Sequence, residues 1–83
     1  MAKQTFERIK HIDRLIHLKA TGTPAILSRK LHISERTLYD YIHLMKEMGA
    51  PIYYSRARET YYYKFEGGFV FKFLDVDHLN KNV

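Results

Sequence analysis

The sequence predicts an α+β fold in which three helices are followed by a small antiparallel β-sheet. Up to Pro51 the apolar side chains recur at the spacing of amphipathic helices, and after Pro51 they alternate as in β-strands. A chain of 83 residues has room for one domain. We expect that domain to span residues 1–76 and residues 77–83 to form a frayed C-terminal tail.

The first helix is expected to start at Gln4 or Thr5 and to end at Gly22, because glycine commonly terminates helices. Leu15 lies beside its apolar stripe, and charged residues occupy the other faces. The stripe itself consists of Phe6, Ile9, Ile12 and Ile16.

A short helix is predicted next, from Pro24 to Leu31. Thr23 is suited to cap its N-terminus, and a proline at the first helical position loses no intrahelical hydrogen bond. Leu27 lies one turn before Leu31, so both side chains point the same way.

The third helix is predicted over residues 35–48, with Ser34 as its N-cap. Gly49 suits the position after the helix, and Pro51 prevents the helix from continuing. The tight turn before it contains His32, which tolerates the left-handed backbone region better than most residues. The apolar stripe of this helix consists of Leu38, Ile42 and Met45.

Three short strands are predicted after Pro51, over residues 52–55, 60–65 and 69–74. The charged residues 56–59 would form the loop of a hairpin between the first two strands. Gly67 and Gly68 would form a tight turn with positive φ before the third.

Two helices joined by a short turn and followed by a basic hairpin follow the order of a winged helix-turn-helix. The short turn makes the two helices cross steeply, so that the second projects outward, and a projecting helix fits the DNA major groove. Its outward face would carry Arg36, Asp40 and His43, with Thr37 and Tyr39 at its N-terminal end. Arginine can contact guanine or phosphate, and hydroxyl groups suit phosphate oxygens.

The segment GTPAILSRKLHISERTLYDYIHLMKEMGAPIYYSRARETYYY resembles the N-terminal winged helix-turn-helix domain of DeoR-like and WYL-type bacterial transcription regulators. The stretch ISERTLYDYI is similar to the family's recognition-helix start, and GAPIYYSRARETYYY to its basic turn and aromatic wing. The resemblance implies a DNA-binding role, with Arg56 and Arg58 at the wing tip. Asp40 stands where the family commonly has a basic residue, and no small-molecule effector domain is evident. The candidate DNA-binding residues are Thr23, Ser34, Glu35, Arg36, Thr37, Tyr39, Asp40, His43, Arg56 and Arg58.

Composition favours the same function. The net charge of +5 suggests a polyanionic partner, so we expect a cytoplasmic regulator that binds double-stranded DNA through helix 35–48 and wing 56–59. The alternative is a protein-interaction module that dimerises or docks without DNA. The sequence has no cysteine and no pair of histidines at metal-binding spacing, so we expect no metal and no cofactor. It also shows no nucleophile beside a base, so we do not expect an enzyme. No apolar run is long enough for a membrane span.

A homodimer is expected through the predicted strand 69–74. Nine of the 12 aromatic residues lie between Tyr53 and Phe73, more than a minimal wing needs. One face of this strand would pack on the protomer's own helices, and the other would leave Val70 and Leu74 on an edge open to a second copy. The competing arrangement is a monomer in which the first helix covers this strand.

Overall fold

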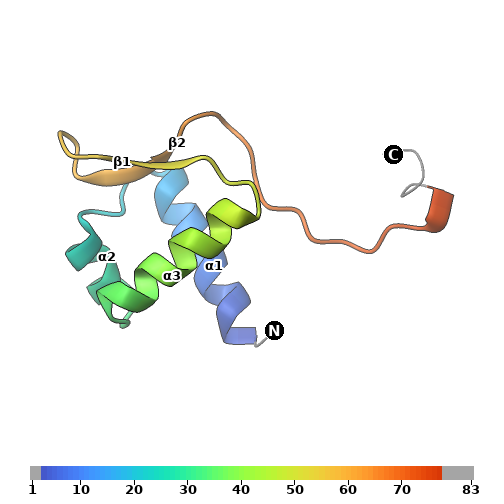
Figure 1. The fold of residues 1–83 in the computed structure, drawn as a ribbon, viewed down its shortest axis with the longest axis horizontal. Coiled ribbons are helices and arrows are strands. Elements are labelled where there is room, and N and C mark those ends of the chain that lie inside the picture. Colours follow the sequence, from blue (N-terminus) through green and yellow to red (C-terminus); the bar gives the residue numbers. More distant parts are fainter. Residues whose placement is uncertain (1–2, 78–83) are drawn as a thin grey trace.

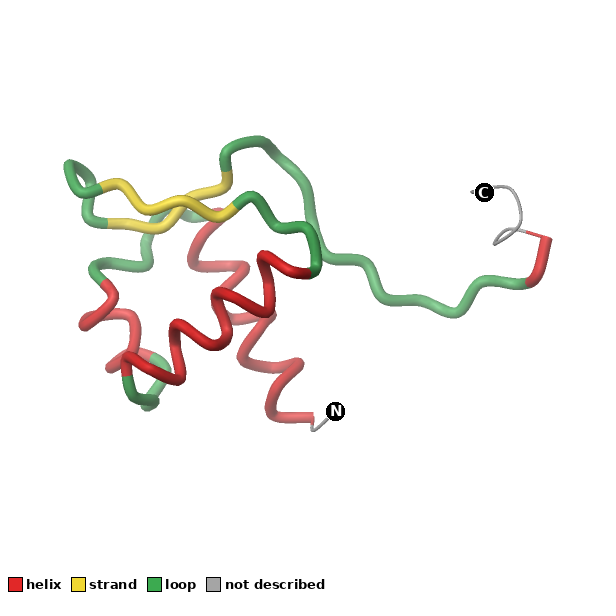
Figure 2. Tube along the Cα trace, viewed as in Figure 1, coloured by secondary structure: helices red, strands yellow, loops and turns green. Residues whose placement is uncertain are grey.

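The protein is represented by a computed structural model that describes residues 3–77. It contains three helices, α1 (Lys3–His17), α2 (Pro24–Lys30) and α3 (Glu35–Glu47), and two strands, β1 (Ile52–Ser55) and β2 (Thr60–Tyr63). The strands form an antiparallel hairpin that lies across one side of the three helices, and an extension without a strand runs away from them towards the C-terminus (Figures 1 and 2). The predicted α+β architecture of three helices and a wing hairpin is therefore confirmed.

All three helices end in the same hydrogen-bonded motif, in which the second residue after the helix adopts a positive φ. The left-handed residues are Lys19 (φ 52°), His32 (φ 57°) and Gly49 (φ 104°). After each, an N–H group reaches back five residues; the Ala20 N–H, for example, donates to the Leu15 carbonyl over 2.9 Å. This is the Schellman arrangement, which satisfies carbonyl groups at a helix end. The predictions for His32 and Gly49 are confirmed.

The predicted end of the first helix at Gly22 is wrong, because α1 stops at His17 and Lys19 takes the left-handed position. Gly22 has a separate role in the connection to α2, where its φ is 76°. A Cβ atom added there would lie 2.7 Å from Cγ2 of Ile26, so this position requires glycine.

The N-caps predicted for the other two helices are present. The Thr23 side chain accepts a hydrogen bond from the Ile26 N–H, and the Ser34 side chain accepts one from the Thr37 N–H. These bonds satisfy donors that would otherwise lack an intrahelical partner, so the two helix starts are fixed by local sequence.

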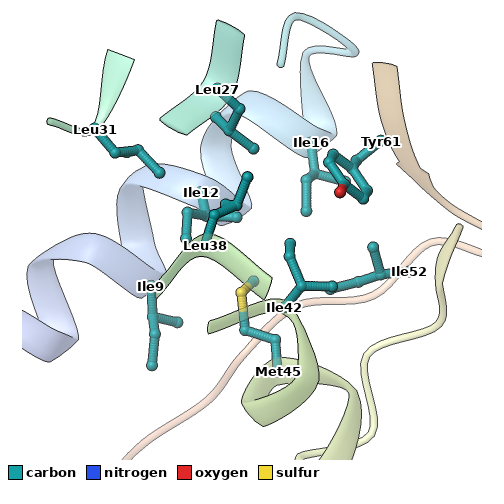
Figure 3. Close-up of a cluster of buried hydrophobic side chains, with 10 residues drawn as sticks. All are labelled: Ile9, Ile12, Ile16, Leu27, Leu31, Leu38, Ile42, Met45, Ile52 and Tyr61. Atoms are coloured by element: carbon teal, nitrogen blue, oxygen red, sulfur yellow. The ribbon is translucent and has the colours of Figure 1, made fainter. Parts of the chain in front are cut away.

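The core lies between the helices and the inner face of the hairpin (Figure 3). The predicted stripes of α1 and α3 meet there with the leucines of α2, while Phe6 at the open end of α1 stays 37% exposed. The strands add one residue each, Ile52 and Tyr61. The buried cluster comprises Ile9, Ile12, Ile16, Leu27, Leu31, Leu38, Ile42, Met45, Ile52 and Tyr61.

A buried polar contact ties the α1–α2 connection to the hairpin. The Tyr61 N–H donates to Oγ1 of Thr21 over 2.8 Å, and the Thr21 N–H donates to Oγ1 of Thr60 over 3.3 Å. Thr21 is fully buried and Thr60 is 3% exposed. Thr21 thus gives β2 a hydrogen-bond partner on the side that faces away from β1.

The second strand ends earlier than predicted, at Tyr63 instead of residue 65. β1 begins at Ile52, opposite Tyr63, and residues 48–51 before it connect it to the end of α3. The Lys64 N–H still donates to the Pro51 carbonyl over 2.9 Å, and beyond that point the hairpin has no further partner for β2.

The third predicted strand is wrong, because residues 69–74 form no strand in the described part of the chain. Gly67 and Gly68 are also not among the described positive-φ residues, so the predicted tight turn is absent. Phe69 packs on the core, but Phe71 and Phe73 are 90% and 98% exposed. An alternating segment forms a strand only beside a hydrogen-bonding neighbour, and the hairpin ends before it can supply one. Residues 78–83 of the predicted frayed tail lie outside the described residues.

Candidate nucleic-acid interface

The outward face of α3 is the first part of the candidate interface. Leu38 and Met45 are fully buried, so the opposite side of the helix faces solvent, and Arg36, Asp40 and His43 are all exposed there. His43 does not stand alone on this face, because its Nε2 lies 3.3 Å from Oε1 of Glu47, one turn further on. The predicted orientation of the helix is confirmed.

The first turn of α3 combines a cap with a free hydroxyl donor. Ser34 accepts the Thr37 N–H over 3.1 Å, and its own hydroxyl donates to Oγ1 of Thr37 over 3.0 Å. Ser34 therefore uses its donor within the turn. Thr37 accepts that bond and keeps its own O–H to donate, for example to a phosphate oxygen.

The wing-facing edge of α3 carries Glu35 and Tyr39. Burial, and to a smaller extent the nearby Tyr39, Tyr54 and Glu35, raise the pKa of Tyr61 to about 12. The first turns of α3 therefore lie near Tyr61, in the half of the hairpin that is closer to the wing loop. Tyr39 is half exposed, whereas Glu35 adds a negative charge between helix and wing.

Thr23 acts as the N-cap of α2, and its hydroxyl oxygen accepts the Ile26 N–H over 3.2 Å. It is only partly exposed, in contrast to Arg36. Its oxygen is thus engaged as a helix cap, and its contact with nucleic acid stays a prediction.

The wing tip is the second part of the candidate interface. Arg56 and Arg58 are exposed in the loop between β1 and β2, which Ser55 fixes by accepting the Arg58 N–H over 3.2 Å. Glu59 closes the loop with a φ of 52°. The wing tip and the α2–α3 turn lie at the same end of the molecule, away from the C-terminal extension (Figure 1). In this view the wing tip lies above and the α2–α3 turn below, both on the side of the molecule away from the extension (Figure 1).

Two lysines near the wing were not predicted as site residues. Lys19 lines a groove together with Arg58 and Tyr62, and Lys64 Nζ lies 5.7 Å from the ring centre of Tyr53. The strand alternation places Lys64 on the same face as Tyr53 once the register is known. Lys19 could not be placed, because the sequence predicted a helix through it.

The described residues contain no group of three histidines, aspartates or glutamates that could hold a metal ion. Within the same residues, no helix is both long and apolar enough to cross a membrane.

Comparison with known proteins identifies the family. Residues 8–64 match the family model described as "HTH domain", so the chain belongs to the helix-turn-helix domain family. The match runs from α1 to the end of the hairpin and includes α3 and the wing tip. No match was found among curated proteins or among solved structures.

Proposed function

We propose that this helix-turn-helix protein is a small bacterial transcription regulator that recognises specific sequences in double-stranded DNA. In this proposal α3 enters the major groove and wing residues 56–59 contact the backbone or the minor groove. The observation that carries it is the exposure of Arg36 in the first turn of α3, together with the exposure of Arg56 and Arg58 in the wing loop. A DeoR-like regulator of this kind acts in the cytoplasm.

Arg36 is the residue proposed to read bases. It is exposed in the first turn of a projecting helix, where arginine can donate two hydrogen bonds to guanine. Thr37 next to it would donate to a phosphate and fix the register of the helix. Asp40, one turn on, would accept from cytosine N4 or repel the backbone.

Arg56 and Arg58 are proposed to hold the duplex without reading it. They are carried by a loop instead of a helix, and they are free to follow the phosphate backbone. Binding that depends on phosphates releases counterions, so contacts with about 4 to 6 phosphates predict a slope of about −4 to −5 for log affinity against log salt.

The test is to select binding sites from genomic fragments and then to titrate variants by fluorescence anisotropy. Arg36→Ala is expected to cost about 1 to 3 kcal/mol on the selected site and to relax its base preference, because a bidentate contact is lost. Arg58→Ala is expected to weaken all sequences alike and to flatten the salt slope by about one. Lys10→Ala is the charge-matched control, since Lys10 is exposed on α1 and pairs with Glu7.

The proposal fails if no site is enriched and the salt slope is near zero. In that case the alternative, a protein-docking module, is favoured by the highly exposed Phe71 and Phe73. If Arg36→Ala lost the same affinity for the selected site as for random duplex, Arg36 would contact only phosphates and would not read bases.

We also propose that the protein binds DNA as a homodimer joined through segment 69–74. The support is chemical: Val70, Phe71 and Phe73 are exposed on a segment whose residues are not part of the hairpin. Two copies would present two recognition helices to half-sites about 34 to 36 Å apart. Light scattering of the wild type and of Phe73→Asp tests this, and a constant monomer mass at high concentration with one-to-one DNA binding would exclude the dimer.

A further inference from the structure

The five tyrosines of the hairpin are not used equally by the fold. Tyr54 and Tyr61 face the helices and pack edge to face, with ring centres 5.0 Å apart. Tyr63 donates a hydrogen bond to Oδ1 of Asp13 over 2.6 Å. Tyr53 and Tyr62 remain, paired across the strands on the opposite face. Packing in the core and the contact with α1 therefore account for the positions of three of these rings. They do not account for Tyr53 and Tyr62.

The rings of Tyr53 and Tyr62 form a small aromatic platform. Their centres are 6.1 Å apart and their planes differ by 32°, so the rings lie closer to parallel than to perpendicular. Tyr53 is 48% exposed. The hairpin lies over the helices in Figure 1, and this platform is on its outer face, turned away from the core.

Cations border both rings of the platform. Lys64 Nζ lies 5.7 Å from the ring centre of Tyr53. Lys19 and Arg58 line a groove of about 300 Å³ beside Tyr62. Lys19 reaches this position because it ends α1 with a positive φ, which brings the α1–α2 connection next to β2.

The floor of this groove carries hydroxyl groups as well. Ser55 and Thr60 line it together with Tyr62, and no acidic side chain is among its lining residues. Glu66 borders a neighbouring hollow that Lys19 and Lys64 share, so the surface as a whole keeps a positive excess. A positive groove beside one exposed ring, Tyr53, and one partly buried ring, Tyr62, suits a ligand that offers both phosphates and flat aromatic groups.

We propose that the outer face of the hairpin binds single-stranded nucleic acid. Unpaired bases stack on Tyr53 and Tyr62, and phosphates bind Lys19, Arg58 and Lys64. Double-stranded DNA does not supply this match, because its base faces are covered by their neighbours, whereas a single strand offers every base face to an aromatic ring. This surface is distinct from the outward face of α3, and the inference goes beyond the proposed duplex recognition.

The test measures anisotropy of a labelled oligothymidylate of about fifteen nucleotides, a length within the site sizes of single-strand binders. The variant Tyr53→Thr/Tyr62→Thr keeps strand-forming residues and is expected to lose at least about tenfold in affinity, the scale of one lost base stack. Tyr53→Phe/Tyr62→Phe keeps the rings and is expected to bind as the wild type does. Met48→Ala is the matched control, because Met48 is a large apolar side chain of similar exposure (53%) at the C-terminal end of α3, outside both proposed binding surfaces.

A second measurement uses the unaltered protein, so it does not depend on the fold of any variant. Stacked bases are expected to quench tyrosine fluorescence, and an abasic strand of the same length is expected to bind at least about tenfold more weakly. Equal binding of the abasic strand, or no binding of oligothymidylate at low salt, would overturn the inference. Loss of duplex binding alone would overturn only the proposed regulator function. The two proposals share Arg58, but duplex reading is assigned to the outward face of α3 and base stacking to Tyr53 and Tyr62.

Discussion

Thr21 is expected to control the stability of the whole domain, and Thr21→Val tests this. The residue is fully buried, and its hydroxyl oxygen accepts the Tyr61 N–H over 2.8 Å. The hydroxyl also donates to the Gly22 carbonyl over 2.9 Å. Valine has nearly the same shape, so the substitution removes these hydrogen bonds while it leaves the packing in place.

The expected loss follows from the orphaned groups. A buried N–H without a partner costs about 1 to 3 kcal/mol, and Tyr61 is too deeply buried for solvent to take the place of the threonine hydroxyl. For a domain of this length the total stability is about 4 to 12 kcal/mol, so a loss of about 2 kcal/mol is a large share. The melting temperature is expected to fall by about 8 to 16 °C.

Thermal and urea unfolding followed by circular dichroism measure this loss. Thr21→Ser is the control, because serine keeps the oxygen and removes only a methyl group. The serine variant is expected to lose about 1 kcal/mol, the value of one buried methyl group. If Thr21→Val were as stable as the wild type, or Thr21→Ser as unstable as Thr21→Val, the Thr21–Tyr61 hydrogen bond would not be what holds the hairpin to the α1–α2 connection.

Two further predictions concern pH and the charge on α3. The contribution of Tyr61 to stability is expected to be constant below about pH 10 and to be lost as the pH rises towards 12, because burial raises its pKa to about 12 and the unfolded chain releases that proton near 10; the raised pKa of Tyr63 acts in the same direction. Tyr61→Phe should flatten this decline in urea titrations at about pH 9 to 11, and an unchanged slope would show that Tyr61 does not cause it. Asp40→Arg is expected to tighten binding to random duplex and to steepen the salt slope by about one, since it replaces repulsion of phosphate by attraction. Weaker or unchanged binding in the anisotropy titration would show that Asp40 does not face the backbone.

The helices were predictable because their signals are local. Thr23 and Ser34 cap the helices they precede, and Gly49 ends α3, as the sequence indicated. Each of these residues acts within one turn of its own position, so no knowledge of the tertiary fold is needed. The exception is Lys19, which takes a left-handed backbone that glycine usually provides, and the sequence therefore favoured Gly22 instead.

The candidate site was predictable in its position and less so in its details. The exposed face of α3 follows from the apolar stripe alone, which is why Arg36 was placed correctly on the outside. The proximity of Glu35 to Tyr61 depends on where the hairpin packs. The hydrogen bond from the Ser34 hydroxyl to the Thr37 hydroxyl depends on side-chain rotamers. Neither is encoded in residue spacing.

The extension shows most clearly where sequence patterns stop being informative. Residues 69–74 place a phenylalanine at every second position, as an alternating strand would, yet only the hairpin strands are paired. β1 and β2 are joined by a loop of four residues, so closing them costs little entropy and each supplies the other's hydrogen bonds. Segment 69–74 lies beyond the last pair of the hairpin, in which Ile52, the first residue of β1, is paired with Tyr63 of β2. No residue of β1 remains to pair with it. Alternation thus specifies which faces a strand would have, whereas the supply of a neighbour decides whether it forms, and that neighbour has to come from outside the hairpin. The dimer proposed above is one way to provide this neighbour, because segment 69–74 of a second copy could pair with it. The light-scattering test of the dimer therefore also tests whether this segment forms a strand.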